Sequence, residues 1–374
     1  MARILRDAVR PFLYHDLSWK GVMDLIKITP KTHVIVTGGA GFIGSYLSAR
    51  LLSSGAQVTI LTRHVEAPRA RQLATQGATV LAWDATSQPS APVMDCLAAA
   101  QVFCHLAADV SVRSPRLHAT NVNGTRRALE LTAEHEIPYF VYASSIEAQG
   151  LGSDQEIPLC EDAPCRPVSE YGQSKAEAEQ VVAEWAKAPG HSALVLRIGN
   201  IYGPGSAWML HPCLMGLVGV TPLRHAWPML RDRRFQPLYI EDLTEGLVRT
   251  ISRRLTGTYN LTGEETVSVS GYLRTLAGLA GLSAQFDRIQ APINGADSPT
   301  SQIDPDFAYL LMGRPEQCHR VYDNTKLRRE IGGYVRWSLA RGLAATLEWY
   351  HAGGTLSAVI QSLRRQGAHT CMSH

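Results

Sequence analysis

The sequence has no long apolar run and no strong excess of charge of either sign. No segment approaches the roughly 18 apolar residues that a membrane-spanning helix requires, and the apolar stretch 213–220 is short and rich in glycine. The net charge is only +3, and the most basic block, residues 231–234, is short enough to be a solvated turn. We therefore expect no membrane span and no nucleic-acid partner.

The sequence also has few cysteines and no arrangement of them that indicates a metal site. Its seven cysteines include no C-x-x-C pair, and Cys160 and Cys165 have no second pair at metal-like spacing. Residues 1–31 lack the apolar core of a signal peptide, so we expect reduced thiols in a cytoplasmic protein. This amphipathic N-terminal arm can pack on the domain, on a second subunit or on a membrane surface, and the first two are commoner.

Short apolar runs alternate with amphipathic segments from residue 33 onwards. The runs predicted as strands are 33–38, 57–62, 77–83, 101–107, 139–144 and 193–198, and the intervening helices include 42–54, 123–135 and 174–187. Fully apolar strands that alternate with helices indicate a parallel sheet covered on both faces. The sequence therefore predicts an α/β, doubly wound Rossmann fold.

The alternation ends near residue 200. Residues 203–237 have no clear period, 285–320 look irregular, and further helices are predicted over 241–254, 324–331 and 338–352, with a strand over 258–262. We predict an N-terminal arm (1–31), a dinucleotide-binding domain (32–200, to which 238–262 return), a smaller interleaved substrate-binding region (201–237 and 263–352) and a loose tail (353–374).

A glycine-rich loop, TGGAGFIG, follows the first predicted strand and opens the first helix. Gly38, Gly41 and Gly44 fit G-x-x-G-x-x-G, and Gly39 with the last two also fits G-x-G-x-x-G. Such glycines let the backbone turn tightly and approach a pyrophosphate at a helix N-terminus. Strand, loop and helix lie in the order that dinucleotide binding requires.

The end of the second strand indicates which dinucleotide is bound. NAD-selective sites place an acidic residue there, whereas this sequence has Thr62, Arg63 and His64. Arg63 can pair with a 2′-phosphate, so NADP(H) is favoured over NAD(H), although an exposed surface arginine would look the same. Asp84, after the third strand, is placed either to contact adenine or to cap the next helix.

A tyrosine and a lysine stand four residues apart in SEYGQSK, at the start of a predicted helix. Residues at this spacing share a helix face, so Tyr171 and Lys175 can act on one small molecule. Both residue types are also common on solvated faces, so this pair alone does not decide its role.

Together these motifs resemble the extended short-chain dehydrogenase/reductase family, within the NAD-dependent epimerase/dehydratase superfamily. The resemblance spans about residues 33–352. Within the family, the motifs resemble most the 3β-hydroxysteroid dehydrogenase and dihydroflavonol reductase-like branch. It rests on TGGAGFIG, HLAA, NVNGT, YASSIEAQG, Tyr171-x-x-x-Lys175, RIGNIYGPG, RFQPLYIEDL and DNTKLRREIG.

The resemblance implies roles for individual residues. Tyr171 would be the acid/base, Lys175 would set its pKa and hold the nicotinamide ribose, and Ser145 rather than Ser144 would bond the reacting oxygen. A free phenol has a pKa near 10, and a neighbouring ammonium is expected to lower it. The cofactor would contact Phe42, Ile43, Ala85, Leu106, Ala107, Ala108, Asn121 and Ile198, although a structural role for Asn121 is equally open.

Three reactions are known in this family. The Asp-Glu pair of 4,6-dehydratases is absent, because Ile146 and Glu147 follow Ser145. We favour a ketone/alcohol oxidoreductase that acts on a small, apolar or natural-product-like substrate over a nucleotide-sugar epimerase, because the acidic residue of NAD-dependent epimerases is missing. ADVSVRS (108–114), with Arg233 or Arg234 as a diphosphate ligand, supports the epimerase. A catalytically silent dinucleotide-binding subunit is the third alternative.

Two further expectations concern surfaces. The apolar stretch 207–220 is either a substrate lid or part of the packing of the small domain. The family often dimerises through the Tyr/Lys helix, and Val181, Val182 and Trp185 are compatible with such a homodimer.

Overall fold

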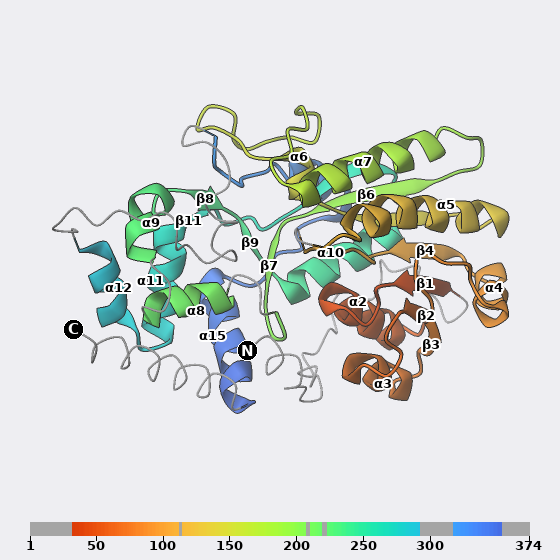
Figure 1. Cartoon of the computed structure of the whole chain (residues 1–374), viewed down its shortest axis with the longest axis horizontal. Helices are drawn as coiled ribbons and strands as arrows, with labels where there is room; N and C mark the ends of the chain where they lie inside the picture. Colours follow the sequence, from red (N-terminus) through yellow and green to blue (C-terminus); the bar gives the residue numbers. More distant parts are fainter. Residues whose placement is uncertain (1–31, 112–113, 207–209, 219–222, 292–316, 354–374) are drawn as a thin grey trace.

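The computed structural model describes residues 32–111, 114–206, 210–218, 223–291 and 317–353 (Figure 1). The predicted N-terminal arm and all but the first residue of the predicted tail lie outside these ranges. Statements below about structure concern the described residues.

Seven parallel strands form the central sheet, in the order β10-β6-β5-β4-β1-β2-β3. They are β1 (His33–Thr37), β2 (Gln57–Thr62), β3 (Thr79–Ala82), β4 (Val102–His105), β5 (Phe140–Ser145), β6 (Ala193–Ile198) and β10 (Gly257–Leu261). The predicted doubly wound fold is confirmed. The strand order reverses between β1 and β4, and open parallel sheets bind ligands at such a reversal, beyond the carboxyl ends of the strands.

Helices cover both faces of the sheet because alternate side chains of each buried strand point to opposite sides. Val34 and Val36 belong to one apolar core and Ile35 to a second. The first core includes α2 (Phe42–Ser53), α3 (Pro68–Thr75) and α10 (Ile240–Ser252), and the second includes α4 (Ala91–Ala98), α5 (Gly124–Glu134) and α7 (Glu170–Trp185).

The C-terminal region gathers at the end of the molecule away from β1, β2 and β3 (Figure 1). Its helices are α8 (Leu210–Val218), α9 (Leu223–Leu230), α11 (Val269–Leu279), α12 (Ser283–Gln290) and α15 (Leu339–Ala352), with α14 (Thr325–Ile331) packed on α10 and β10. Two small sheets link it to the main one: β7 (Asn200–Tyr202) with β9 (Pro237–Tyr239), and β8 (Arg234–Phe235) with β11 (Val267–Ser268).

Residues 203–237, which show no clear period in the sequence, contain the helices α8 and α9. Leu210, Cys213, Leu214 and Leu217 are all buried, at helical spacing, where α8 packs against α11 and α12. For this described part of the predicted lid, core packing is therefore the correct alternative. The rest of the predicted lid, 207–209 and 219–220, lies outside the described residues.

The apolar positions on α7 are explained by packing within the chain. Val182 is buried in the second core, and Val181 and Trp185 pack partly buried against it. The indole of Trp185 also stacks on His191, with ring centroids 3.9 Å apart. These three residues therefore provide no argument for the predicted homodimer.

Candidate active site

The loop after β1 is shaped by the close approach of its own backbone. Gly38 has φ +67°, and a Cβ on it would lie 2.8 Å from the amide nitrogen of Ala107 in the loop after β4. A Cβ on Gly44 would lie 2.2 Å from the carbonyl oxygen of Gly38, and one on Gly41 would lie 3.0 Å from the same atom. Glycine is required for this geometry, and it brings the loops at the sheet reversal into contact.

Helix α2 begins directly after this loop, with Phe42 and Ile43 in its first turn. Its N-cap residue, Gly41, offers no capping side chain, and the first turn contains no acidic residue. The amides and the positive end of the helix dipole are therefore suited to an anion. This arrangement fits the pyrophosphate of a dinucleotide.

Arg63 is exposed immediately after β2, and no carboxylate occupies the end of that strand. Asp84, after β3, forms an ion pair with Arg116 at 2.6 Å and accepts a hydrogen bond from the amide of Thr86. Although partial burial opposes it, these contacts lower the pKa of Asp84 to about 2. Asp84 does not cap the next helix, α4, whose N-cap is Ser90, so that alternative is wrong.

Most of the other predicted cofactor residues lie at the carboxyl edge of the sheet. Leu106, Ala107 and Ala108 are half-buried directly after β4, and Ile198 ends β6, where it pairs in register with Ser145. Ala85, which follows β3, is buried beside Gly124: a Cβ on that glycine would lie 3.1 Å from its methyl group.

Asn121 lies in a short π-helix, η2 (Ala119–Asn123), and its amide group is engaged by the protein. Its Oδ1 accepts from the amide of Asp109 at 2.8 Å, and its Nδ2 donates to the Asp109 carbonyl and to the Ser174 hydroxyl, both at 2.9 Å. These contacts join the loop after β4 to α7. They support the structural alternative for Asn121, and a cofactor contact stays a prediction.

The structure brings Ser145, Tyr171 and Lys175 together. Ser145 ends β5 and caps the short helix α6 (Ile146–Gln149), and its hydroxyl lies near enough to the Tyr171 phenol to lower the pKa of that phenol. Lys175 lies one turn further along α7, where its ammonium donates to the carbonyl of Ala143 at 2.7 Å and lies 6.0 Å from the centre of the Tyr171 ring. The hydroxyl of Ser144 instead donates to Glu179, away from Tyr171.

Burial shifts the pKa values of the Tyr171 phenol and the Lys175 ammonium in opposite directions. It raises the pKa of Tyr171, as does the nearby carboxylate of Glu147, and the Ser145 hydroxyl has the opposite effect. It lowers the pKa of Lys175 to about 7, opposed by Glu179. In the chain itself burial outweighs the lowering expected from a neighbouring ammonium, so the phenol is neutral, and a lowering by the ammonium and the positive nicotinamide together stays a prediction.

Sequence reasoning missed the polar partners beside Tyr171. Glu147 is buried, accepts from the hydroxyl of Ser169 at 3.1 Å and pairs with Arg320 at 3.4 Å. Its position two residues after Ser145 was used only to exclude the Asp-Glu pair of 4,6-dehydratases, although it also places a carboxylate near the site. Arg320 gave no signal, because the fold brings it from 173 residues further along the chain.

Arg233 is also buried, so the expected solvated turn at 231–234 is wrong for this residue. Burial lowers the pKa of Arg233, and the nearby charge of Arg320 lowers it further. The charges of Arg233 and Arg320 thus act on each other at the boundary of the C-terminal region. Arg234 is half-buried and forms an ion pair with Asp154.

Within the described ranges, no group of histidine, cysteine or acidic side chains is arranged to hold a metal ion. All six cysteines in those ranges are free thiols. No helix there is both long enough and apolar enough to cross a membrane.

Comparison with known proteins places this geometry among dinucleotide enzymes. A dTDP-glucose 4,6-dehydratase of Streptomyces griseus is 29% identical, covering 86% of this chain and 94% of the relative. A 4-hydroxy-2-methyl-3-oxo-4-farnesyl-3,4-dihydroquinoline-1-oxide ketoreductase of Stigmatella aurantiaca is 28% identical, covering 85% and 96%. The solved structure of MoeE5 in complex with UDP-glucuronic acid and NAD superposes with a TM-score of 0.65 at 26% identity, covering 86% and 99%.

These relatives catalyse different reactions, so they do not decide the branch to which this chain belongs. The family profile described as "NAD dependent epimerase/dehydratase family" matches residues 34–261, which include the glycine loop, Ser145, Tyr171 and Lys175. A nicotinamide dinucleotide fits the glycine cradle and the uncapped start of α2. The chain belongs to the NAD-dependent epimerase/dehydratase family.

Proposed function

We propose that this protein is an NADP(H)-dependent oxidoreductase that interconverts a ketone and a secondary alcohol on a small substrate. The observation that carries the proposal is the grouping of Ser145, Tyr171 and Lys175 at the carboxyl edge of the sheet, with the Lys175 ammonium 6.0 Å from the centre of the Tyr171 ring. A family enzyme with these three groups can move a proton at the substrate oxygen.

The nicotinamide ring, when bound, supplies or accepts the hydride. In reduction, Tyr171 donates its proton to the substrate oxygen, because burial keeps the phenol neutral. The hydroxyl of Ser145 donates a hydrogen bond to the same oxygen as negative charge develops on it. Lys175 holds the ribose hydroxyls, and its ammonium stabilises the phenolate left after proton transfer.

The choice of NADP(H) rests on Arg63. It is exposed at the end of β2, where a guanidinium can pair with a 2′-phosphate and where a carboxylate would repel one. Because NADPH commonly supplies hydride, reduction is the direction we propose. The ketoreductase relative supports a natural-product-like substrate, whereas the packing of α8 no longer supports an apolar lid.

A nucleotide-sugar epimerase is the second candidate, and the arginines favour it. Arg233 and Arg320 are both buried, and Arg320 contacts Glu147 beside Tyr171. Such a pair suits the diphosphate of a nucleotide sugar, and the similar protein MoeE5 forms a complex with UDP-glucuronic acid. The same Ser145, Tyr171 and Lys175 would then take a proton from one alcohol and return it to the keto intermediate.

The Tyr171→Phe variant tests the proposal. Wild-type protein is screened with ketones and NADPH, and with UDP- and dTDP-sugars and NAD, by following reduced nicotinamide or sugar interconversion. We expect ketone-dependent oxidation of NADPH that Tyr171→Phe lowers by at least about 100-fold while cofactor binding is retained. The matched control is Tyr259→Phe on β10. It removes a hydroxyl outside the dyad formed by Tyr171 and Lys175 and should keep activity.

Other results of this screen would favour one of the alternative functions. Interconversion of sugars without net oxidation of NADPH would favour the epimerase over the oxidoreductase. Turnover that does not depend on the Tyr171 hydroxyl, or cofactor binding without turnover on any substrate, would contradict both enzymes and favour the silent subunit.

A further inference from the structure

A buried carboxylate lies one helical turn beyond Lys175. Lys175 and Glu179 are four residues apart on α7, with only 2% and 9% of their surfaces exposed. Residues at this spacing are neighbours on a helix face, and low exposure leaves little water to screen their charges. The charge of Glu179 therefore acts directly on the side chain that the proposed function places at the cofactor.

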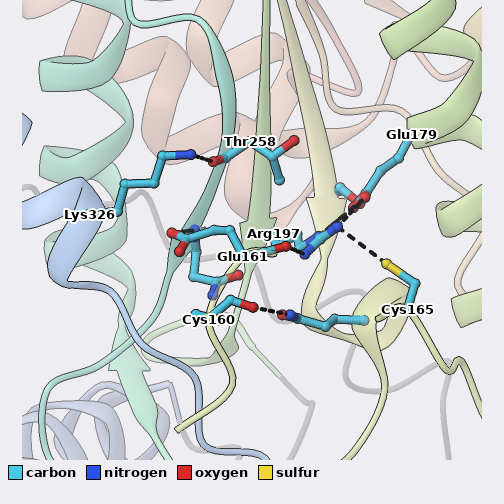
Figure 2. Close-up of polar contacts among 10 residues, drawn as sticks. Cys160, Glu161, Cys165, Glu179, Arg197, Thr258 and Lys326 are labelled. Carbon is cyan, nitrogen blue, oxygen red and sulfur yellow. Dashed lines mark hydrogen bonds and ion pairs between the residues drawn. The ribbon is translucent and has the colours of Figure 1, made fainter. Parts of the chain in front are cut away.

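The Glu179 carboxylate is held rigidly by Arg197 of β6, as Figure 2 shows. Arg197 donates from Nη2 to Oε2 at 2.8 Å and from Nε to both carboxylate oxygens, at 3.1 and 3.2 Å. The hydroxyl of Ser144 adds a fourth hydrogen bond, at 2.5 Å. A carboxylate that accepts so many hydrogen bonds is held in one place, so its negative charge has a fixed position.

Arg197 is held in turn by contacts at its outer end. Its Nη1 donates to the carbonyl of Glu161 at 2.9 Å, and its Nη2 lies 3.3 Å from the sulfur of Cys165 (Figure 2). The chain of contacts thus runs from an exposed loop through Arg197 to Glu179, and the charge of Glu179 in turn acts on Lys175.

The other groups near Lys175 carry no compensating negative charge. On β4, His105 is buried, and burial together with the charge of Lys175 lowers its pKa to about 3, so it is neutral. On β5, the Tyr142 ring centre lies 4.7 Å from the ammonium, and burial raises the pKa of its phenol. Tyr171 on α7 is likewise a neutral phenol. Among the described residues, Glu179 supplies the carboxylate that balances Lys175.

We propose that Glu179, fixed by Arg197 and Ser144, is a positioning residue that holds Lys175 in its ammonium form and thereby sets the pH range in which the dyad works. The inference rests on the proposed role of Lys175 at the cofactor. An ammonium is present below its pKa and is lost above it. Removal of the neighbouring negative charge therefore makes Lys175 lose its proton at lower pH.

The test is the pH dependence of NADPH affinity, measured by fluorescence titration of the full chain. For Glu179→Gln, we expect the loss of affinity on the basic side to move to lower pH by about one unit or more. The matched control is Glu184→Gln, the same change on an exposed residue of α7, which should follow wild type. Glu179→Asp keeps the charge and should restore most of the wild-type profile, which a purely structural role would not do.

A second variant covers the case in which Glu179→Gln does not fold. Glu179→Gln with Arg197→Met removes both charges of the buried pair, a change that proteins often tolerate, and it should show the same shift. A profile that matches wild type in either folded variant would overturn the inference.

Lys175→Met separates this inference from the proposed function. If it abolishes the pH dependence while Glu179→Gln follows wild type, only the role of Glu179 is wrong. If it leaves the affinity and its pH dependence unchanged, the proposed function of the dyad fails as well.

Discussion

At Gly44 a single methyl group would enter the space between the first turn of α2 and the preceding loop. A Cβ there would lie 2.2 Å from the Gly38 carbonyl oxygen, a backbone atom that cannot move without opening the loop. We expect Gly44→Ala to lower the free energy of unfolding by about 1–3 kcal/mol and to weaken dinucleotide binding. Thermal unfolding and cofactor titration measure the two effects.

Gly278→Ala is the matched control. Gly278 lies in α11, and a Cβ there meets no atom within 4 Å, so the change should raise stability by up to about 1 kcal/mol without altering cofactor binding. Equal effects of the two substitutions would contradict the structural role assigned to Gly44.

At this residue scale, the sequence predicts contacts that are local or that a motif carries. Tyr171 and Lys175 share a helix face because they are four residues apart, and Gly41 and Gly44 are required by their close approach to the carbonyl oxygen of nearby Gly38. The pairing of Glu147 with Arg320 was beyond such reasoning because it joins distant segments. The shift of the Tyr171 pKa was missed for the same reason, since burial is a property of the folded chain.

Among the elements, α8 allows a test of whether the apolar stretch 207–220 is a substrate lid or part of the packing of the small domain. Leu214 is buried where α8 packs against α11 and α12, so Leu214→Ala should lower the free energy of unfolding by about 2–4 kcal/mol and leave KM nearly unchanged. Met229 on α9 is 46% exposed, and Met229→Ala should cost less than about 1 kcal/mol. Denaturant unfolding with steady-state kinetics measures both. A raised KM with unchanged stability in Leu214→Ala would instead support the lid.

The elements differ in how well sequence predicts them. The strands of the main sheet were predicted to within a few residues, because they are short apolar runs that alternate regularly with longer amphipathic segments. Helices α8 and α9 were not recognised: their apolar residues recur at helical spacing, but prolines interrupt them, including Pro228 inside α9.

Across the whole molecule, one apolar core joins the dinucleotide-binding sheet to the C-terminal region. It extends from Val34 in β1 through Leu243 in α10 to Leu347 in α15. We therefore expect one unfolding transition, with coincident changes in circular dichroism and tryptophan fluorescence. NADPH at about 100 times its Kd should stabilise both signals together, by about 2.7 kcal/mol. Two separated transitions, with only the first or second shifted by NADPH, would show that the regions fold independently.

At this scale the fold class followed from the alternation of strands and helices, and the family from the order of its motifs. The substrate did not follow, because the groups that would select it, such as Arg233 and Arg320, meet only through the packing of the C-terminal region. Such guanidinium groups can bind the diphosphate of a nucleotide sugar. The preference for NADP(H) or NAD(H) is therefore the property that most directly distinguishes the two candidate reactions.

The cofactor preference is measured by titrating purified protein with NADPH and with NADH, and by repeating the titration on Arg63→Ala and on Arg71→Ala. Arg71 is an exposed arginine paired with Glu66 and serves as the control. We predict that wild-type protein binds NADPH at least about tenfold more tightly than NADH, and that only Arg63→Ala removes this difference. Binding of NADH as tight as that of NADPH, or NAD retained through purification, would contradict the account and place the nucleotide-sugar epimerase first.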